Sequence, residues 1–406
     1  MHPLATLLAC CLLWVAHACA AGPEMMNVQV GPRPYTLVEA MRPGALRERL
    51  EARSCRESAF RTTAFSIAHR GAPMLYPEHT RESYVAAARM GAGIIECDVT
   101  FTRDRQLVCR HAQNDLHRTT DILLRPSLAA RCARPFTPAR FDAAGDLLSP
   151  ADAECRTSDI TLAEFKTLSA RMDRVDPAAR SVEEYLRTED PASFPGTGGT
   201  LLSHAESIAL LRQLGVDMIP ELKRPVVAMP FGDFSQRDFA RAMIAEYRAA
   251  GITPGDVWPQ SFSLDDVLFW KSAEADFGRQ AVYLDDAKTR AELPTAAELR
   301  ELASKGLRIW APPIWALVSV EGGRPVASRT ARDARAAGLE LITWSLERPV
   351  RLPAGTPHAV AAQLHALSHA GATMEVLDVL GRDIGVKGVF SDWPGTVTYY
   401  ANCMGL

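Results

Sequence analysis

The stretch "GIIECDVTF", residues 93–101, has the apolar and β-branched residues of a buried strand, yet it carries Glu96 and Asp98. Side chains two residues apart on a strand point to the same side, so both acids share a face with Ile94. Two like charges in apolar surroundings repel each other and lose hydration unless a cation neutralises them. The pattern therefore predicts a divalent cation at this strand.

Composition places this strand in an ordinary globular protein. The chain has 406 residues, of which 47% are hydrophobic and 23% charged, and its formal net charge is -3. This length suits one large α/β domain with an insertion. The charge balance provides no basic surface for nucleic acid.

The N-terminus has the layout of a secretory signal peptide. An apolar run from Leu4 to Ala16 is followed by small residues. A membrane anchor is the alternative, but the run is shorter than the roughly 20 residues that a spanning helix needs. We expect residues 1–20 to be removed and the protein to be exported, to the periplasm or outside the cell. No later segment is long and apolar enough to span a bilayer.

Six cysteines remain after residue 20, and an even number in an exported chain permits disulfides. Cys132 and Cys155 flank a loop-like stretch and are the preferred pair. Cys97 and Cys109 lie inside predicted strands, where a buried free thiol is an equally good interpretation.

Short β-rich runs alternate with helical patterns along the chain, which indicates βαβ units and a parallel sheet. Eight such runs fit a closed (β/α)8 TIM barrel. They cover residues 65–69, 93–100, 106–111, 217–223, 257–263, 280–286, 339–346 and 387–394. Residues 308–315 are a ninth candidate that weakens this count.

Two helices and a long connection complete the plan. Residues 80–91 and 204–215 read as barrel helices, and Thr80 can cap the first. The connection between the third and fourth predicted strands is too long for a plain βα loop; within it, residues 158–168 read as a capped helix. We expect an extension over residues 21–60, a barrel over 61–400 and an insertion subdomain over 113–200.

Further candidate site residues lie at the ends of predicted strands. Glu221 and Lys223 in "IPELK" share a strand face, so Glu221 can join Glu96 and Asp98 around one Ca²⁺ or Mg²⁺ ion. Zn²⁺ is disfavoured because no HxxEH or CxxC spacing accompanies the acids. The alternative is an ion-pair network in which Arg70, Arg110 or Lys223 balances the acids without a metal.

His69 in "IAHRG" and His111 in "LVCRH" end two of the predicted strands. A single histidine there is more often a satisfied polar residue than a catalyst. Two histidines beside a metal site and next to Arg70 provide a general acid and a general base.

The run from "IAHRGAPMLYPEHTRESY" to "IIECDVTFTRDRQLVCRH" resembles the signature of glycerophosphodiester phosphodiesterases, and the resemblance continues through "PELK", "QSF", "TWS" and "GVFSDWP". It spans roughly residues 65 to 400, and the insertion resembles that of longer family members. The resemblance implies acid/base roles for His69 and His111, metal ligation by Glu96, Asp98 and Glu221, and substrate contacts from Arg70, Lys223, Trp344 and Glu78. His79 and Ala112 stand where the family usually has Asn and Asp. Asp115 or His117 could replace the missing contact, although surface-loop positions are the simpler interpretation for both.

The resemblance implies a phosphoric diester hydrolase that uses one divalent cation, releases glycerol 3-phosphate and an alcohol, and acts on a small-molecule substrate. We assign His69 as base and His111 as acid. One alternative is a phospholipase D-like enzyme acting on lysophospholipid or sphingomyelin, and another is an exported binding protein without activity. The sequence leaves the oligomeric state open.

Overall fold

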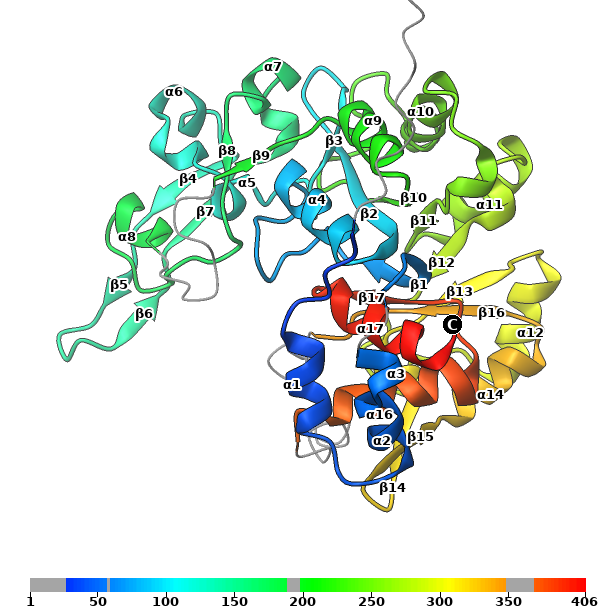
Figure 1. Cartoon of the computed structure of the whole chain (residues 1–406). Coiled ribbons are helices and arrows are strands. Elements are labelled where there is room, and N and C mark those ends of the chain that lie inside the picture. The colour runs from blue at the N-terminus through cyan, green and yellow to red at the C-terminus, as the bar shows by residue number, and fades with distance from the viewer. Residues whose placement is uncertain (1–26, 57–58, 188–197, 348–368) are drawn as a thin grey trace, which may run out of the picture.

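The computed structural model describes residues 27–56, 59–187, 198–347 and 369–406. The predicted signal peptide lies outside these ranges. Eight parallel strands form the central barrel, and pairing between β1 and β2 closes it. The closed parallel barrel is confirmed (Figure 1). Its strands are β1 (Thr63–Ala68), β2 (Ala92–Phe101), β10 (Asp217–Leu222), β11 (Gln260–Ser261), β12 (Val282–Leu284), β13 (Ile309–Ala311), β16 (Glu340–Thr343) and β17 (Gly388–Ser391).

Two strand assignments differ from the sequence-based expectation. Residues 106–111 form β3 (Leu107–Cys109), which pairs antiparallel with β2 outside the ring of eight strands. The connection after Phe101 is too short for the crossover that a parallel neighbour requires. The ninth candidate, residues 308–315, supplies the barrel strand β13 instead. The long connection therefore lies between the second and third strands of the barrel.

Apolar side chains fill the barrel interior below the strand ends. They come from alternate positions of the strands, as the two-residue period of a strand requires. This interior cluster consists of Ile67, Ile94, Ile219, Val282, Leu284, Ile309, Ala311, Ile342 and Phe390. The next inward-facing positions beyond Ile67, Ile94 and Ile219 are His69, Glu96 and Glu221. The carboxyl ends of these strands thus project polar side chains into the barrel mouth.

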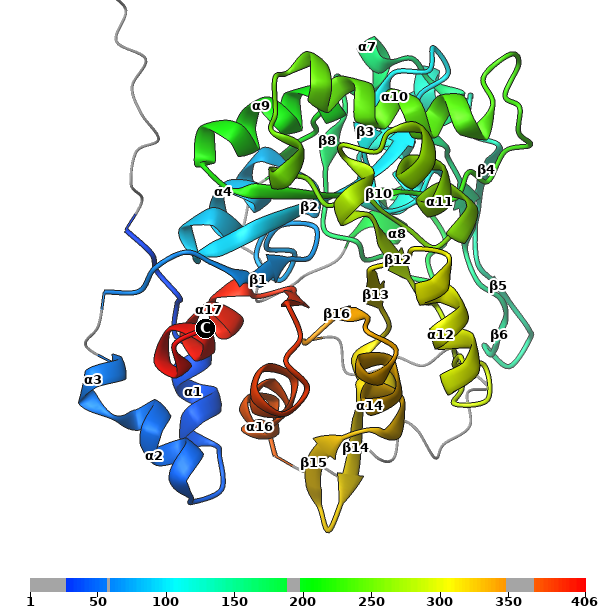
Figure 2. The same cartoon turned by 90° about the vertical axis from the view of Figure 1, so that its right-hand side faces the viewer.

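Helices surround the barrel (Figures 1 and 2). Both predicted barrel helices are present: Thr80 caps α4, and Ser203 forms a capping box with Glu206 at the start of α9. Gly215 ends α9 with φ 69°, a left-handed conformation that glycine adopts at low cost. The outer helices are α4 (Arg81–Arg89), α9 (His204–Leu214), α10 (Gln236–Ala249), α11 (Leu264–Ala273), α12 (Ala296–Ser304), α14 (Arg329–Ala336), α16 (Ala372–Asp378) and α17 (Pro394–Met404).

Residues between β3 and α9 gather to one side of the barrel around a second apolar cluster (Figure 1). The predicted helix at 158–168 is shorter, a 3-10 turn (Thr157–Asp159) followed by α7, which Thr161 caps. The elements here are α5 (Leu116–Thr119), α6 (Pro126–Ala129), β4 (Arg134–Thr137), β5 (Arg140–Phe141), β6 (Leu147–Ser149), β7 (Asp152–Glu154), α7 (Leu162–Phe165), β8 (Ser169–Ala170), α8 (Val182–Leu186) and β9 (Gly199–Thr200). The division of the chain into domains stays a prediction.

Short elements complete the described chain. Helices α1–α3 lie beside α16 and α17 in both ribbon views. These elements are α1 (Arg33–Glu39), α2 (Ala45–Glu51), α3 (Arg53–Arg56), α13 (Ile314–Leu317), β14 (Val318–Glu321) and β15 (Arg324–Ala327). Helical turns occupy Ile122–Leu124, Pro254–Asp256, Gly278–Gln280 and Val379–Ile384.

Three disulfides join the six cysteines that follow the predicted signal peptide. The preferred pair, Cys132–Cys155, is confirmed. Cys97 and Cys109, for which free thiols were an equal expectation, also form a disulfide, and Cys55 pairs with Cys403. Cys97 and Cys109 pair because β3 folds back antiparallel on β2, which brings their Cα atoms to 5.3 Å.

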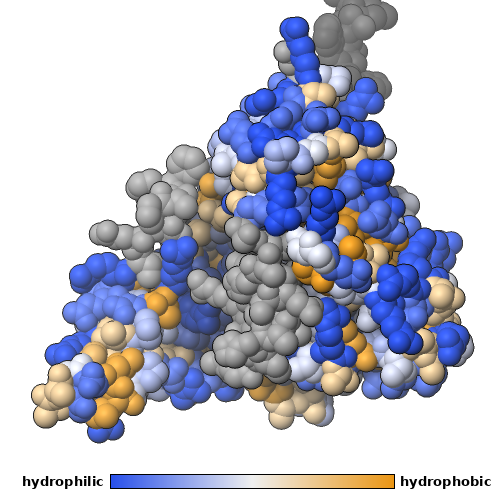
Figure 3. Space-filling view, turned by 90° about the horizontal axis from the view of Figure 1, so that it is seen from below, coloured by the Kyte–Doolittle hydropathy of each residue, from blue (hydrophilic) through white to orange (hydrophobic). Residues whose placement is uncertain are grey.

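The surface of the described chain carries few large apolar residues. Seen from below, hydrophilic residues predominate and apolar residues occur in small groups between them (Figure 3). Among the described residues, no helix combines the length and the apolarity required for a membrane crossing.

Candidate active site

Three acidic residues converge at the barrel mouth. Glu96 and Asp98 lie on β2, and Glu221 lies opposite Asp98 in the register of β10. One carboxylate oxygen from each lies within 4.8 Å of the other two. All three side chains are buried, with residue exposures between 1% and 5%. The structure thus brings together the three acids that the sequence predicts as metal ligands.

The electrostatics of this acid cluster favour a bound cation. Burial, together with the charges of Asp98 and Glu221, raises the pKa of Glu96 well above its ordinary value. Burial and Asp98 also raise the pKa of Glu221 to about 8, against the opposing effect of Lys223. Burial would raise the pKa of Asp98 as well, but Lys223 and His79 hold it well below its usual range. The proximity of the three acids thus disfavours the charged forms of Glu96 and Glu221, and a bound cation would favour them.

The donor set fits a hard divalent cation. Asp98 Oδ1 is buried and accepts no hydrogen bond from any residue that the structure describes. A buried carboxylate oxygen without a donor is costly unless a cation binds it. Oxygen donors are the ligands that Ca²⁺ and Mg²⁺ prefer.

Two basic side chains contact the same acids. Lys223 Nζ lies 2.6 Å from Glu221 Oε1 and 3.8 Å from Asp98 Oδ1. Arg70 Nε lies 3.6 Å from Asp98 Oδ2. These are the ion pairs that the metal-free alternative requires. When all three acids are ionised, these two side chains leave one of the three negative charges uncompensated.

The loop after β1 holds Arg70 in position. Arg70 has φ 60°, an uncommon conformation for a residue with a side chain, and its backbone N–H donates to Glu96 Oε2 at 3.0 Å. Its guanidinium donates to Glu78 Oε2 at 2.8 Å. The fully buried Arg110 also binds Glu78, through the backbone oxygen at 3.2 Å. Glu78 therefore links the two arginines at the rim of the acid cluster.

His69 is oriented by a carboxylate from the far end of the chain. Its Nδ1 lies 2.5 Å from Asp392 Oδ1, and its Nε2 lies 3.9 Å from Glu96 Oε2. Asp392 is held in turn by Glu347, which accepts hydrogen bonds from the Asp392 backbone N–H and the Ser391 hydroxyl. Because the carboxylate fixes the proton on Nδ1, Nε2 is directed at the acid cluster as a proton acceptor.

His111 lies near a second pair of acids, Glu78 and Asp115. One of its ring nitrogens lies within 4.8 Å of carboxylate oxygens of Glu78 and Asp115. Burial, followed by the charges of Arg70 and Lys223, lowers the pKa of His111 well below its ordinary value. No hydrogen bond holds its imidazole ring within the described ranges. His111 is thus a neutral base in the free protein, and an anion placed beside it would raise its pKa.

Trp344 contributes to an apolar wall next to these charges. Its indole N–H donates to the backbone oxygen of Ala311 at 2.9 Å, and its ring packs edge-on against Phe262 at 5.9 Å. Phe262 in turn lies 6.0 Å from Lys223 Nζ. The apolar wall formed by Trp344 and Phe262 thus adjoins Lys223.

Sequence reasoning gave no role to several residues of this site. Asp392 and Gln260 lie inside motifs quoted for the family resemblance, and Gln260 donates to Glu96 Oε1 at 2.9 Å. His79, at the position where the family usually has Asn, donates from Nε2 to Asp98 Oδ2 at 2.8 Å and contacts the Tyr84 hydroxyl through Nδ1. Only the fold shows which acids these side chains contact.

The interpretation of Asp115 and His117 as surface residues is wrong. Both are buried, with exposures of 7% and 9%. Asp115 Oδ2 accepts a hydrogen bond from the backbone N–H of Ala112 at 2.9 Å. The apolar cluster beside the barrel covers this loop, which loop composition alone does not reveal.

Comparison with known proteins identifies the family of this chain. The model of the glycerophosphoryl diester phosphodiesterase family matches residues 69–396. A protein of Arthroderma benhamiae, described as an extracellular protein, is 40% identical over 248 residues, which cover 58% of this chain and all of that one. A probable glycerophosphodiester phosphodiesterase 1 of Mycobacterium tuberculosis is 30% identical over 188 residues, or 46% of this chain and 58% of that one.

A solved structure shares the fold. The crystal structure of a putative glycerophosphoryl diester phosphodiesterase from Silicibacter pomeroyi superposes with a TM-score of 0.56 at 20% identity, and the match covers 86% of this chain and 96% of that one. The family match begins at His69 and includes the strands that carry Glu96, Asp98 and Glu221. The chain therefore belongs to the glycerophosphoryl diester phosphodiesterase family.

Proposed function

We propose that this protein hydrolyses glycerophosphodiesters to glycerol 3-phosphate and an alcohol, with one divalent cation and two histidines. The observation that carries the proposal is the convergence of three buried acids beside His69, Arg70 and Lys223. His111 lies next to Glu78, the carboxylate that binds Arg70. Acid/base groups around a hard-cation site are the components that phosphodiester cleavage requires. Family membership agrees with this reaction class.

Arg70 and Lys223 bind the substrate's phosphate oxygens in this proposal. Both are buried, and neighbouring carboxylates raise the pKa of each despite the opposing effect of burial, so both stay charged. A divalent cation held by Glu96, Asp98 and Glu221 would supply further positive charge for the phosphoryl oxygens in the transition state. Trp344 packs against the glycerol carbons, and Glu78 holds Arg70 in place.

His69 acts as the general base and His111 as the general acid. His69 Nε2 removes a proton from the nucleophile, a water molecule or a neighbouring glycerol hydroxyl, as its oxygen bonds to phosphorus. If the hydroxyl attacks, the first product is a cyclic glycerol phosphate, and a water molecule then opens the ring to give glycerol 3-phosphate. Asp392 stabilises the imidazolium that forms. The bound phosphodiester anion opposes the charges of Arg70 and Lys223, which allows His111 to hold a proton. His111 then gives this proton to the alcohol oxygen as its bond to phosphorus breaks.

The choice of cation follows from location. We propose that residues 1–20 direct export and that the protein acts in the periplasm or outside the cell. The three disulfides support this, because disulfides persist in oxidising compartments. Ca²⁺ is then the preferred ion, and Mg²⁺ the second choice.

Release of glycerol 3-phosphate from glycerophosphocholine tests the proposal. We expect turnover that chelation abolishes and that Ca²⁺ or Mg²⁺ restores. Lysophosphatidylcholine and sphingomyelin serve as comparison substrates, since a phospholipase D-like enzyme would prefer them. Turnover that survives exhaustive chelation would contradict the proposed metal site. Absence of turnover with all three substrates would contradict the proposed enzymatic activity.

A further inference from the structure

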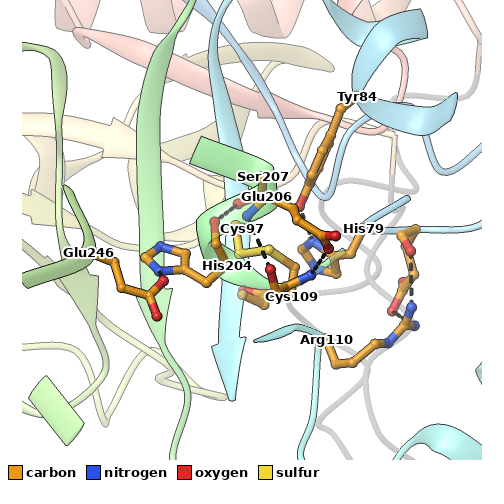
Figure 4. Close-up of a disulfide and its surroundings, with 12 residues drawn as sticks. His79, Tyr84, Cys97, Cys109, Arg110, His204, Glu206, Ser207 and Glu246 are labelled. Carbon is orange, nitrogen blue, oxygen red and sulfur yellow. Dashed lines mark hydrogen bonds and ion pairs between the residues drawn. A yellow bond between two sulfur atoms is a disulfide. The ribbon is translucent and has the colours of Figure 1, made fainter. Parts of the chain in front are cut away.

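A disulfide joins Cys97 to Cys109 (Figure 4). Cys97 is the residue between Glu96 and Asp98 on β2, and Cys109 ends β3, two residues before His111. One covalent bond therefore joins the strand that carries two metal-ligand candidates to the strand that leads to a histidine of the acid/base pair.

The two sulfur atoms are shielded from solvent. Because side chains alternate along a strand, Cys97 points away from the barrel mouth, into the layer between the barrel and its helices. Cys97 is 1% exposed and Cys109 is fully buried. Figure 4 shows Tyr84 of α4 and Ser207 of α9 around them. The bond is thus a fixed part of the fold, without the access that a surface redox switch needs.

Strand β3 needs such a connection because it lies outside the barrel ring. It pairs with β2 on one side; on the other, Val108 forms a single bridge with Ser203 and the Cys109 N–H donates to the Leu202 oxygen at 3.3 Å. The antiparallel pairing of β3 with β2 ends at Cys109, which lies opposite Val99. Beyond it, the Arg110 N–H donates one more hydrogen bond, to the backbone oxygen of Asp98 at 2.8 Å. A three-residue strand with so few backbone hydrogen bonds opens easily at its ends, and this end leads directly to His111.

The ring of His111 has no hydrogen bond of its own among the described residues, so its place depends on the backbone that carries it. We infer that the Cys97–Cys109 disulfide positions His111 against the acid cluster, so that its imidazole meets the leaving alcohol. The inference rests on the proposed function. It makes the two cysteines positioning residues, because neither contacts substrate in the proposed scheme.

Replacement of both cysteines tests the inference. In Cys97→Ala/Cys109→Ala, we expect kcat for glycerophosphocholine to fall about 10- to 100-fold, since a misplacement of about 1 Å can cost 100-fold in rate. With a 4-nitrophenyl phosphodiester, whose leaving group departs without a proton, the loss should stay below about 3-fold, because only the acid step depends on His111. The dissociation constant for Ca²⁺ should change little, since β2 and β10 stay paired.

The matched control is Cys132→Ala/Cys155→Ala, which removes another buried disulfide, away from the barrel mouth. We expect it to change kcat for either substrate less than about 2-fold, because it leaves the path to His111 intact. The unfolding temperature of each variant reports any general loss of stability. If the alanine variant does not fold, Cys97→Val/Cys109→Ala fills more of the space and allows the same comparison.

Three outcomes would overturn the inference. An equal loss with both substrates would show a general structural role, as would failure of both barrel variants to fold while the control folds. Unchanged turnover of glycerophosphocholine would show that the bond does not position His111. A wild-type protein that cleaves neither substrate with Ca²⁺ or Mg²⁺ would instead contradict the proposed function, a separate result.

Discussion

Asp392 Oδ1 lies 2.5 Å from His69 Nδ1, although the two residues are 323 positions apart in the chain. They meet because β1 and β17 are neighbours in the closed barrel, with Ala68 opposite Ser391. The contact leaves His69 Nε2 facing Glu96. A carboxylate that holds a histidine in one tautomer is a recurring arrangement for a catalytic base.

Replacing Asp392 should therefore impair catalysis more than binding. In Asp392→Asn, we expect kcat to fall about 100-fold or more, with KM changed less than about 3-fold, because the amide favours the wrong tautomer of His69. Steady-state kinetics with glycerophosphocholine measure both constants. Glu347→Gln should lower kcat less than Asp392→Asn does, because Glu347 accepts hydrogen bonds from the Asp392 backbone N–H and the Ser391 hydroxyl and does not contact His69. An Asp392→Asn variant with normal kcat would exclude His69 as the base.

The two histidines should each be essential for turnover. We expect His69→Ala and His111→Ala to lose about 10²- to 10⁴-fold in kcat, the range for acid/base groups, while the unfolding temperature stays near that of the wild type. His117→Gln is a suitable control because His117 is buried but lies outside the acid cluster. Near-normal rates in either alanine variant would contradict the two-histidine scheme.

His79 should tune the cation site through Asp98. His79→Ala removes the hydrogen bond to Asp98 Oδ2, and we expect Ca²⁺ affinity to fall about 10- to 100-fold, as for other residues that orient a metal ligand. His79→Asn introduces the residue that is usual in the family. Because the asparagine amide can still donate a hydrogen bond to Asp98, this variant should lose less Ca²⁺ affinity than His79→Ala. Calorimetric titration with Ca²⁺ measures both. Equal affinity in the alanine variant and the wild type would show that Asp98 needs no such support.

Asp217 should make stability fall with rising pH, independently of the active site. Burial, followed by the charge of Asp256, raises its pKa to about 6, whereas the unfolded-state pKa is about 3.9. The folded chain thus binds more protons between about pH 4 and 6, so this contribution to stability is complete below about pH 4 and is lost as the pH rises through 6.

Asp217→Asn removes this loss. We expect the variant to be more stable than the wild type above pH 6, by less than about 1 kcal/mol because the partly exposed side chain is screened by solvent, and to gain nothing near pH 4. Urea unfolding at several pH values measures the difference. Asp256→Asn removes only the charge of Asp256, the smaller of the two causes of the raised Asp217 pKa, so it should increase stability above pH 6 by a smaller amount. A gain that is equal at pH 4 and 7 would contradict the assignment to Asp217.

The sequence alone was sufficient to predict which acids face the barrel interior. Because the period of a strand is two residues, Glu96 and Asp98 had to share the face of Ile94, and Glu221 had to share that of Lys223. The cost of three buried carboxylates then pointed to a cation. Local capping chemistry likewise fixed the starts of α4 and α9, since Thr80 and Ser203 act on backbone groups only three residues away.

The apolar pattern of a segment does not by itself show whether the segment becomes a barrel strand. Residues 106–111 and 308–315 have similar apolar patterns, but the first forms the antiparallel β3 and the second supplies the barrel strand β13. The five residues between Phe101 and Leu107 already exclude a parallel crossover. Loop length is therefore the signal that separates the two cases, and the apolar pattern alone does not.

The sequence by itself determined which residue types face the barrel interior, because alternation along a strand is a local property of the backbone. Only the tertiary structure decided which distant residues meet: Asp392 with His69, Gln260 with Glu96, and Cys97 with Cys109. The physical reason is that closure and register bring separate strand ends together, and one residue's slip in register would separate these pairs without changing any local preference.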